Sequence, residues 1–126
     1  METRLFCSEI RKETRRIAVK AERFELNGRT MVIRLLEDLD HHNAVYIREM
    51  ADNFLEKYPV NRVIFDFSGV EFMDSSGIGV IMGRYKQMRY VNGEVCVCGI
   101  GKNVDRIFRM TGLYKLVKQI DRAEVV

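Results

Sequence analysis

The residues best suited to chemistry are two neighbouring serines in the run Asp74-Ser75-Ser76-Gly77-Ile78-Gly79. A serine nucleophile needs a general base, and the two histidines of the chain, His41 and His42, adjoin each other far from this run in sequence. The Gly-x-Ser-x-Gly pattern of a strained nucleophile turn is also absent, because Ser75 is flanked by Asp74 and Ser76. We therefore expect no hydrolase, and no enzyme of another class is indicated.

A second possible use of this run is phosphate binding by its glycines. Gly77-Ile78-Gly79 follows an apolar segment and opens a helical pattern, but a dinucleotide fingerprint needs a third glycine where Met82 stands. No Gly-Lys-Ser/Thr sequence follows either. The simpler interpretation is packing: Gly77 and Gly79 let the helix start lie close to the sheet, and Gly79 and Gly83 present a small-residue face.

Acidic and imidazole groups gather between Glu37 and His42, in the order Glu37-Asp38-Leu39-Asp40-His41-His42. Adjacent histidines on a helix point about 100° apart, so both cannot easily bind one ion, and no distant pair completes a metal site. The favoured interpretation is an acidic cap at the positive end of a helix. We predict no metal and no cofactor.

The three cysteines give no zinc spacing or disulfide framework. Cys96 and Cys98 lie two apart in the strand-like run Glu94-Val95-Cys96-Val97-Cys98, so they share one face of a strand. A single C-x-C without a second ligand pair is poor zinc spacing. We expect buried, reduced thiols.

The totals describe one ordinary domain. The chain has 126 residues and a net charge of +3, with acidic and basic residues spread over the same segments, which gives nucleic-acid binding little support. No apolar run reaches the roughly 18 residues that span a bilayer, and the start Met1-Glu2-Thr3-Arg4 lacks a secretory apolar core. The expected location is the cytoplasm, away from membranes.

The serines must be positioned by a strand, a loop and a helix. Val63-Ile64-Phe65 predicts a buried strand, and Ile78, Ile81, Met82 and Tyr85 recur with a helical period. Aspartate and serine are preferred N-cap residues, so Ser75 or Ser76 is expected at the helix start. That place offers unpaired amides and the positive end of the helix dipole, both favourable to phosphate.

The remaining elements predict an α/β fold with a mixed β-sheet, packed by α-helices. Asn27-Gly28 between two strand-like runs predicts an antiparallel hairpin with a type I′ turn. Residues 1–16 are expected to form a mobile or loosely docked extension, and residues 17–126 the domain. The expected elements after the hairpin are a helix from Asp40 to Pro59, a strand over 62–67, a helix ending near Tyr90, a strand over 95–98, a helix stopped by Gly112 and a strand over 116–120.

The Asp-Ser-Ser-Gly run and the segments around it resemble those of one protein family. The segment from Phe72 to Gln87 resembles the phosphorylation-site segment of bacterial anti-sigma factor antagonists, the sporulation antagonists included, which belong to the STAS domain family. The resemblance runs from Phe24 to Val117 and includes Leu39-Asp40-His41-His42, Gly93-Glu94-Val95, Arg106-Ile107-Phe108 and Thr111-Gly112-Leu113. The chain departs from the family pattern at Glu37, which stands where a glycine is usual, and in its longer N-terminal start.

The resemblance implies a partner-switching role in transcription regulation. The unphosphorylated protein would bind an anti-sigma factor that is also a serine kinase, and so release the sigma factor. The kinase would use ATP to phosphorylate Ser75, the serine directly after the aspartate, and a serine phosphatase would reset the cycle. The resemblance places partner contacts at Asp40, Asp74, Ser76, Gly77 and Ile78, on a protein expected to be a monomer or weak dimer.

A second hypothesis stays open at this point. The chain could be a STAS-type nucleotide-binding or sensory module whose serine is not used. Titration with GTP and ATP separates the two, because tight nucleotide binding without kinase binding favours the module.

Overall fold

The computed structural model describes residues 22–125, which begin with an antiparallel hairpin. Strands β1 (Glu22–Asn27) and β2 (Thr30–Leu35) pair with Asn27 opposite Thr30, so the turn consists of Gly28 and Arg29. The hairpin is confirmed, but the type I′ turn over Asn27-Gly28 is wrong. Asn27 remains in the ladder, and of the two turn residues only Gly28 has a positive φ, 61°. Positive φ at the first central residue alone is the type II′ pattern, which spares Arg29 a strained backbone.

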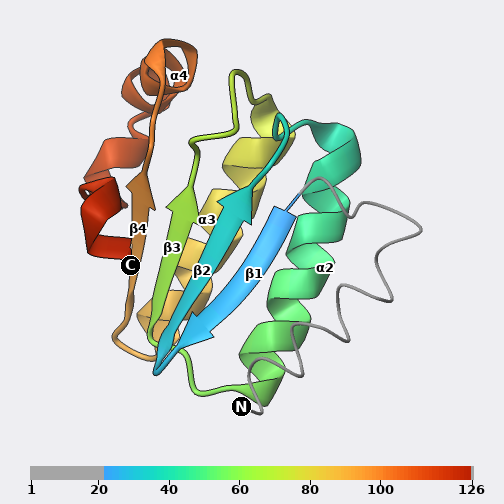
Figure 1. Cartoon of the computed structure of the whole chain (residues 1–126), viewed down its shortest axis with the longest axis vertical. Helices are drawn as coiled ribbons and strands as arrows, with labels where there is room; N and C mark the ends of the chain where they lie inside the picture. Colours follow the sequence, from blue (N-terminus) through green and yellow to red (C-terminus); the bar gives the residue numbers. More distant parts are fainter. Residues whose placement is uncertain (1–21, 126) are drawn as a thin grey trace.

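The elements that follow alternate between helices and strands (Figure 1). The sheet order is β1-β2-β3-β4-β5, and every pair after the hairpin is parallel, so the expected mixed sheet is confirmed. The elements are α2 (His41–Lys57), β3 (Arg62–Asp66), α3 (Ser75–Tyr90), β4 (Glu94–Cys98), α4 (Lys102–Thr111), η1 (Leu113–Lys115), β5 (Lys118–Gln119) and η2 (Arg122–Val125).

Helix boundaries agree with the stop signals in the sequence. Helix α2 begins after its N-cap Asp40 and ends before Tyr58, which is extended because Pro59 follows it. Helix α4 ends at Gly112, whose φ of 76° is left-handed. The last strand is shorter than expected: β5 comprises Lys118 and Gln119, which pair with Cys96 and Val97 of β4. The proposed boundary between residues 16 and 17 lies outside the described residues.

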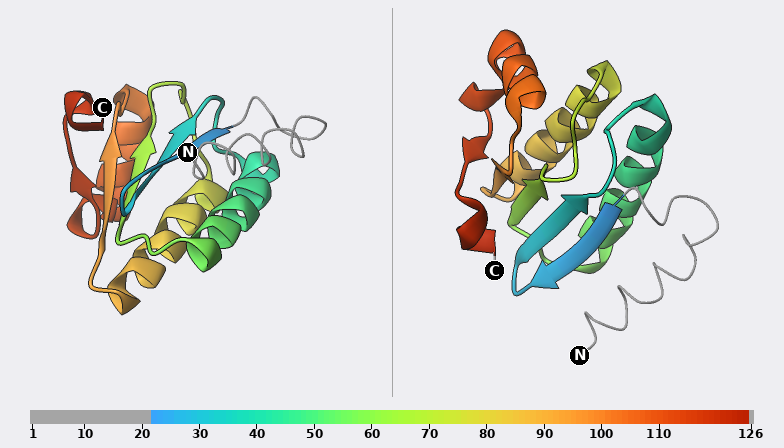
Figure 2. Two further views of the ribbon diagram at one scale, coloured as in Figure 1. Left: turned by 60° about the horizontal axis from the view of Figure 1, so that its bottom comes forward. Right: turned by 45° about the horizontal axis from the view of Figure 1, so that its top comes forward.

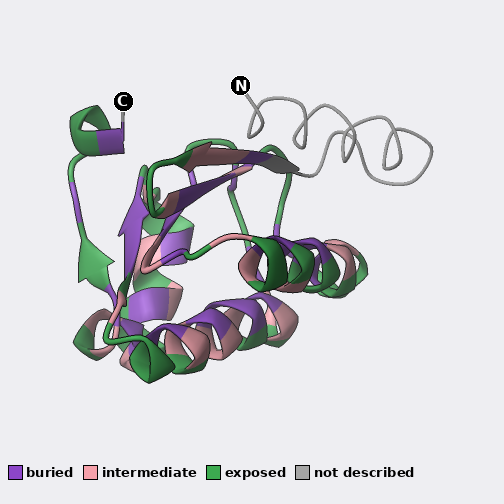
Figure 3. Cartoon of the chain, turned by 90° about the horizontal axis from the view of Figure 1, so that it is seen from below, coloured by how far each residue is buried: buried purple, intermediate pink, exposed green. Residues whose placement is uncertain are grey.

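The parallel strands are buried on both faces, which explains their continuous apolar runs. One face meets helices α2 and α3, which lie side by side beneath the sheet in Figure 2, and the inner sides of these helices are buried in Figure 3. The other face carries a smaller apolar cluster, completed by residues from the C-terminal segment: Val32, Ile64, Cys96, Cys98, Ile120 and Val125.

Helices α2 and α3 are also joined by polar side chains. Arg84 of α3 is only 4% exposed, and its Nη2 lies 3.2 Å from Oδ1 of Asp52 in α2. Gln87 accepts a hydrogen bond from Arg84 Nε and donates one to Asp52 Oδ1. These contacts fix the two helices against each other, and therefore fix the relative position of their starts. Over the described part of the chain, each helix is too short or too polar to cross a membrane.

Candidate functional site

Helix α3 begins at Ser75, directly after an aspartate that caps it. Oδ1 of Asp74 accepts hydrogen bonds from the backbone N–H groups of Ser76, at 2.8 Å, and Gly77, at 3.4 Å. The expectation of a serine at the helix start is confirmed for Ser75. The cap is Asp74, so two of the amides expected to favour a phosphate are already engaged by its carboxylate.

The two serines differ in their surroundings. Ser75 is exposed, and its hydroxyl has no hydrogen-bond partner among the described residues. Ser76 is partly buried, and its Oγ lies 3.2 Å from Nδ1 of His41, the first residue of α2. Ser75 is therefore the serine whose hydroxyl an enzyme can reach without breaking a contact.

The starts of α2 and α3 lie together at the carboxyl end of the sheet (Figure 1). Asp40 caps α2 by accepting from the N–H of Asn43 at 3.0 Å, while the N–H of His41 donates to Oδ2 of Asp74 at 3.1 Å. The backbone of Leu39 also pairs with the loop before α3, donating to Phe72 and accepting from Asp74. Two segments far apart in sequence thus form one surface.

Gly77 is required where α3 passes the loop before α2. A Cβ at this position would lie 2.9 Å from Leu39 Cγ and 2.9 Å from Leu39 O, closer than side chains pack. The close approach is therefore to Leu39, and the expected approach to the sheet is wrong. A Cβ on Gly79 or Gly83 would meet no atom within 4 Å, so the small-residue face is open.

Asp38 was not among the site residues expected from the sequence, yet it holds the loop that carries the serines. Its Oδ1 accepts hydrogen bonds from the N–H groups of Glu71, at 2.9 Å, and Phe72, at 3.1 Å. The acidic cap is thus confirmed for Asp40 alone, while Asp38 stabilises the neighbouring loop. The one signal for Asp38 in the sequence was its place, an acidic residue in the short connection between β2 and α2.

We refer to residues 36–43 and 67–79 together as the acidic end. This surface contains all the residues assigned to partner contacts: Asp40, Asp74, Ser76, Gly77 and Ile78. Their exposure differs, because Asp40 is exposed, Asp74, Ser76 and Ile78 are partly buried, and Gly77 is buried. Ile78 also packs against the main core, so only part of its side chain can meet a partner.

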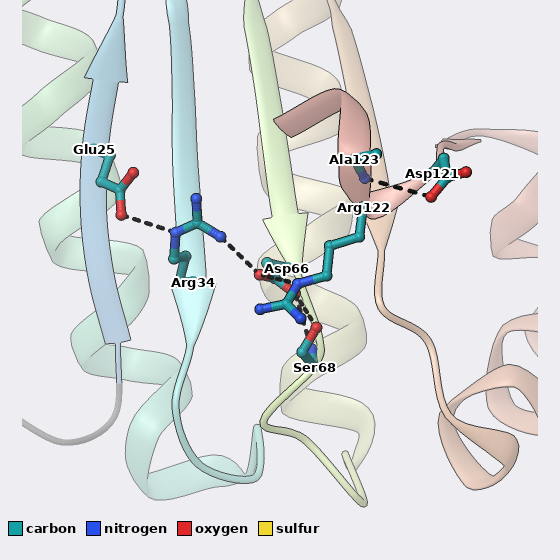
Figure 4. Close-up of polar contacts among 7 residues, drawn as sticks. All are labelled: Glu25, Arg34, Asp66, Ser68, Asp121, Arg122 and Ala123. Atoms are coloured by element: carbon teal, nitrogen blue, oxygen red, sulfur yellow. Dashed lines mark hydrogen bonds and ion pairs between the residues drawn. The ribbon is translucent and has the colours of Figure 1, made fainter. Parts of the chain in front are cut away.

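The start of the loop is fixed by a buried carboxylate at the end of β3 (Figure 4). Asp66 is 3% exposed and accepts from Ser68 Oγ at 2.6 Å and from Ser68 N at 3.0 Å. Its other oxygen lies 2.9 Å from Arg34 Nη1 and 3.5 Å from Arg122 Nε. Burial opposes ionisation, but the Ser68 hydrogen bonds and the two guanidinium groups outweigh it and lower the pKa of Asp66.

The possible metal-binding side chains and the cysteines can be checked in residues 22–125. No group of three or more histidine, cysteine, aspartate or glutamate side chains is placed there to hold a metal ion. Cys96 and Cys98 are buried free thiols, as expected, and burial raises the pKa of both, that of Cys98 to about 11. Cys7 lies outside the described residues.

Comparison with known proteins identifies the family of this chain. The model of the STAS domain family matches residues 9–124. The chain belongs to the STAS domain family. A STAS relative, the anti-sigma F factor antagonist of Paenibacillus polymyxa, is 35% identical over 91 residues, which are 72% of this chain and 78% of that protein.

Two solved structures extend the STAS comparison to three dimensions. The anti-sigma factor antagonist SpoIIAA in its unphosphorylated form has a TM-score of 0.75 at 30% identity, covering 83% of this chain and 92% of that one. The Bacillus cell fate determinant SpoIIAA in its phosphorylated form has a TM-score of 0.68 at 29% identity, covering 83% and 96%. SpoIIAA is thus known in two phosphorylation states on this fold.

Proposed function

We propose that this STAS protein is an anti-sigma factor antagonist whose binding is ended by phosphorylation of Ser75. The observation that carries the proposal is an exposed, unengaged serine at the first position of α3, beside the cap Asp74. Its relatives are named as antagonists of anti-sigma factors. Such antagonists are binding proteins and not enzymes. The protein regulates transcription by occupying a partner, and its place of action is the cytoplasm.

Phosphorylation changes the surface more than the fold. A phosphoryl group adds about −1.5 to −2 charge at neutral pH, next to the carboxylate of Asp74. Because Ser75 is exposed, the group can be added without opening the core. Because Asp74 already engages the Ser76 and Gly77 amides, the phosphate must compete for them or face the partner. A loss of about 3 kcal/mol in a packed interface weakens binding more than a hundredfold.

The partners follow from this cycle. The unphosphorylated form binds an anti-sigma factor that is also a serine kinase, and a separate serine phosphatase removes the phosphate. Asp40, Asp74 and Ser76 supply polar contacts to the kinase, and the exposed part of Ile78 supplies an apolar one. Gly77 acts indirectly, by allowing α3 to approach Leu39.

The test is phosphorylation by the purified anti-sigma factor kinase with ATP, followed by intact-protein mass. The wild-type protein is expected to gain one phosphate, and Ser75→Ala none. Ser76→Ala is the matched control: it removes the neighbouring hydroxyl and one contact to the kinase, so phosphorylation should be slower, but the protein should still gain one phosphate. Full modification of Ser75→Ala would show that the acceptor is another residue.

A binding measurement separates the switch from the nucleotide-binding alternative. Ser75→Glu should bind the kinase more weakly than wild type, although a carboxylate carries less charge than a phosphate. Calorimetric titration of the wild-type protein with GTP and ATP, without the kinase, should show no tight binding. Tight nucleotide binding together with absent kinase binding would favour the sensory module.

A further inference from the structure

Phe72 has a large apolar side chain that is exposed to solvent in the folded protein. Of the six phenylalanines in the described residues, five are buried, whereas Phe72 is 51% exposed. It lies in the acidic end, directly before the buried Met73 and three residues before Ser75. Leu36, also in the acidic end, is 42% exposed and borders the same loop near Gly69. Phenylalanine is among the residue types that are enriched in protein–protein interfaces relative to the rest of the surface.

The backbone of Phe72 is held on both sides. Its N–H donates to Oδ1 of Asp38 at 3.1 Å, and its carbonyl accepts from the N–H of Leu39 at 3.2 Å. The next residue, Met73, is 1% exposed and forms a parallel bridge with Leu39. The ring is therefore presented from a fixed loop, so that little conformational entropy is lost when a partner covers it.

The two segments that make up the acidic end carry charge of one sign, and Lys102 of α4 borders them near Glu71. The acidic end carries five carboxylates and no lysine or arginine, although the whole chain has a net charge of +3. The five are Glu37, Asp38, Asp40, Glu71 and Asp74. A surface of this kind is complementary to an apolar recess bordered by basic side chains.

We propose that Phe72 is the apolar anchor of the docking surface, and that it enters a recess on the anti-sigma factor bordered by lysine or arginine. The inference rests on the proposed function and adds the chemistry of the partner's surface. A second copy of this chain is a poorer occupant, because a symmetric contact through the same surface would bring like charges together. The role of Asp38 is to position the ring by fixing its backbone.

The test compares single alanine variants in binding the purified anti-sigma factor kinase that phosphorylates this protein, by calorimetry. Phe72→Ala is expected to weaken binding by about tenfold or more. Tyr90→Ala and Met110→Ala are matched controls, because these side chains are 90% and 79% exposed but lie outside the acidic end. Both controls should bind within about twofold of wild type, and Phe72→Leu should fall between Phe72→Ala and wild type.

Two further readouts separate an anchor from a structural role. In phosphorylation assays, Phe72→Ala should raise KM with kcat nearly unchanged, since an anchor contributes equally to the ground state and the transition state. A lower kcat at unchanged KM would mean that Phe72 only positions Ser75, and would overturn the proposal. Binding should weaken as salt rises from about 50 to about 300 mM, and an unchanged affinity would exclude the basic border.

The two proposals fail in different ways. If the wild-type protein neither binds the anti-sigma factor nor is phosphorylated by it, the proposed function is wrong and the anchor with it. If the wild-type protein binds and Phe72→Ala binds within about twofold of it, the function stands and the anchor alone is wrong.

Discussion

The backbone N–H of His41 donates to Oδ2 of Asp74 at 3.1 Å, across 33 positions of sequence. The first residue of α2 is thus held by the N-cap of α3. Oδ1 of the same carboxylate accepts from Ser76 and Gly77. One side chain therefore stabilises the starts of both helices and the surface on which Ser75 lies.

Replacement of Asp74 should cost more stability than replacement of a simple cap. Asp74→Ala removes the cap of α3 and the bond to His41, so the free energy of unfolding should fall by about 2 kcal/mol. Asp40→Ala removes one bond to Asn43 and should cost about 1 kcal/mol. Urea denaturation measures both. Equal losses in the free energy of unfolding would mean that the hydrogen bond between His41 and Asp74 adds no stability beyond that of the cap.

Two glycines of α3 should respond to alanine in opposite directions. In Gly77→Ala the new Cβ would meet Leu39 at 2.9 Å, so we expect a loss of about 1–3 kcal/mol as the loop or helix shifts. Gly83→Ala places its Cβ in open space and should add about 0.5–1 kcal/mol through helix propensity. Thermal unfolding of the pair checks this, and stabilisation by Gly77→Ala would contradict the contact with Leu39.

Asp66 should contribute to acid sensitivity. Its pKa in the folded protein is held below the ordinary value of 3.8, because hydrogen bonds from Ser68 and the charges of Arg122 and Arg34 outweigh the effect of burial. A lowered pKa adds stability above about pH 4 and loses it as the pH falls through the folded value. The stability difference between wild type and Asp66→Asn should therefore shrink below about pH 4 in urea titrations. A stability difference that stays constant with pH would contradict a lowered pKa of Asp66.

The thiols on the far face of the sheet should be inert in the native state. Cys98 and Cys96 are buried, and burial raises the pKa of both, with the nearby Asp66 adding to the shift for Cys98, which reaches about 11. In a Cys7→Ser background, a thiol-specific reagent at neutral pH should label native protein very slowly and both cysteines after unfolding. Rapid labelling of the native protein would show that this face opens.

Local patterns were enough to predict most of the fold. Pro59 and Gly112 end helices because proline and left-handed glycine impose the same backbone in any context. The continuous apolar run Val63-Ile64-Phe65 indicated a strand buried on both faces, and the structure has it at the centre of the sheet. Asp40 and Ser75 were placed correctly at helix starts for similar local reasons.

Details that depend on the pairing of distant segments could not be read from the sequence. The hairpin turn shifted by one residue because ladder pairing keeps Asn27 opposite Thr30. The last strand begins later than expected because the N–H groups of Leu116 and Val117 donate to the carbonyl of Leu113 in a turn instead of pairing with β4. Gly77 faces Leu39 instead of the sheet because the loops before α2 and α3 pair with each other.

The sequence by itself determined the elements, the family and the serine segment, because helix caps, apolar periodicity and a local motif are written in consecutive residues. The tertiary structure decided how the segments before α2 and α3 form one surface. Only there do Asp38 and Asp74 reach backbone amides more than 30 positions away. Those hydrogen bonds leave Ser75 exposed, engage Ser76, and present Phe72 among carboxylates.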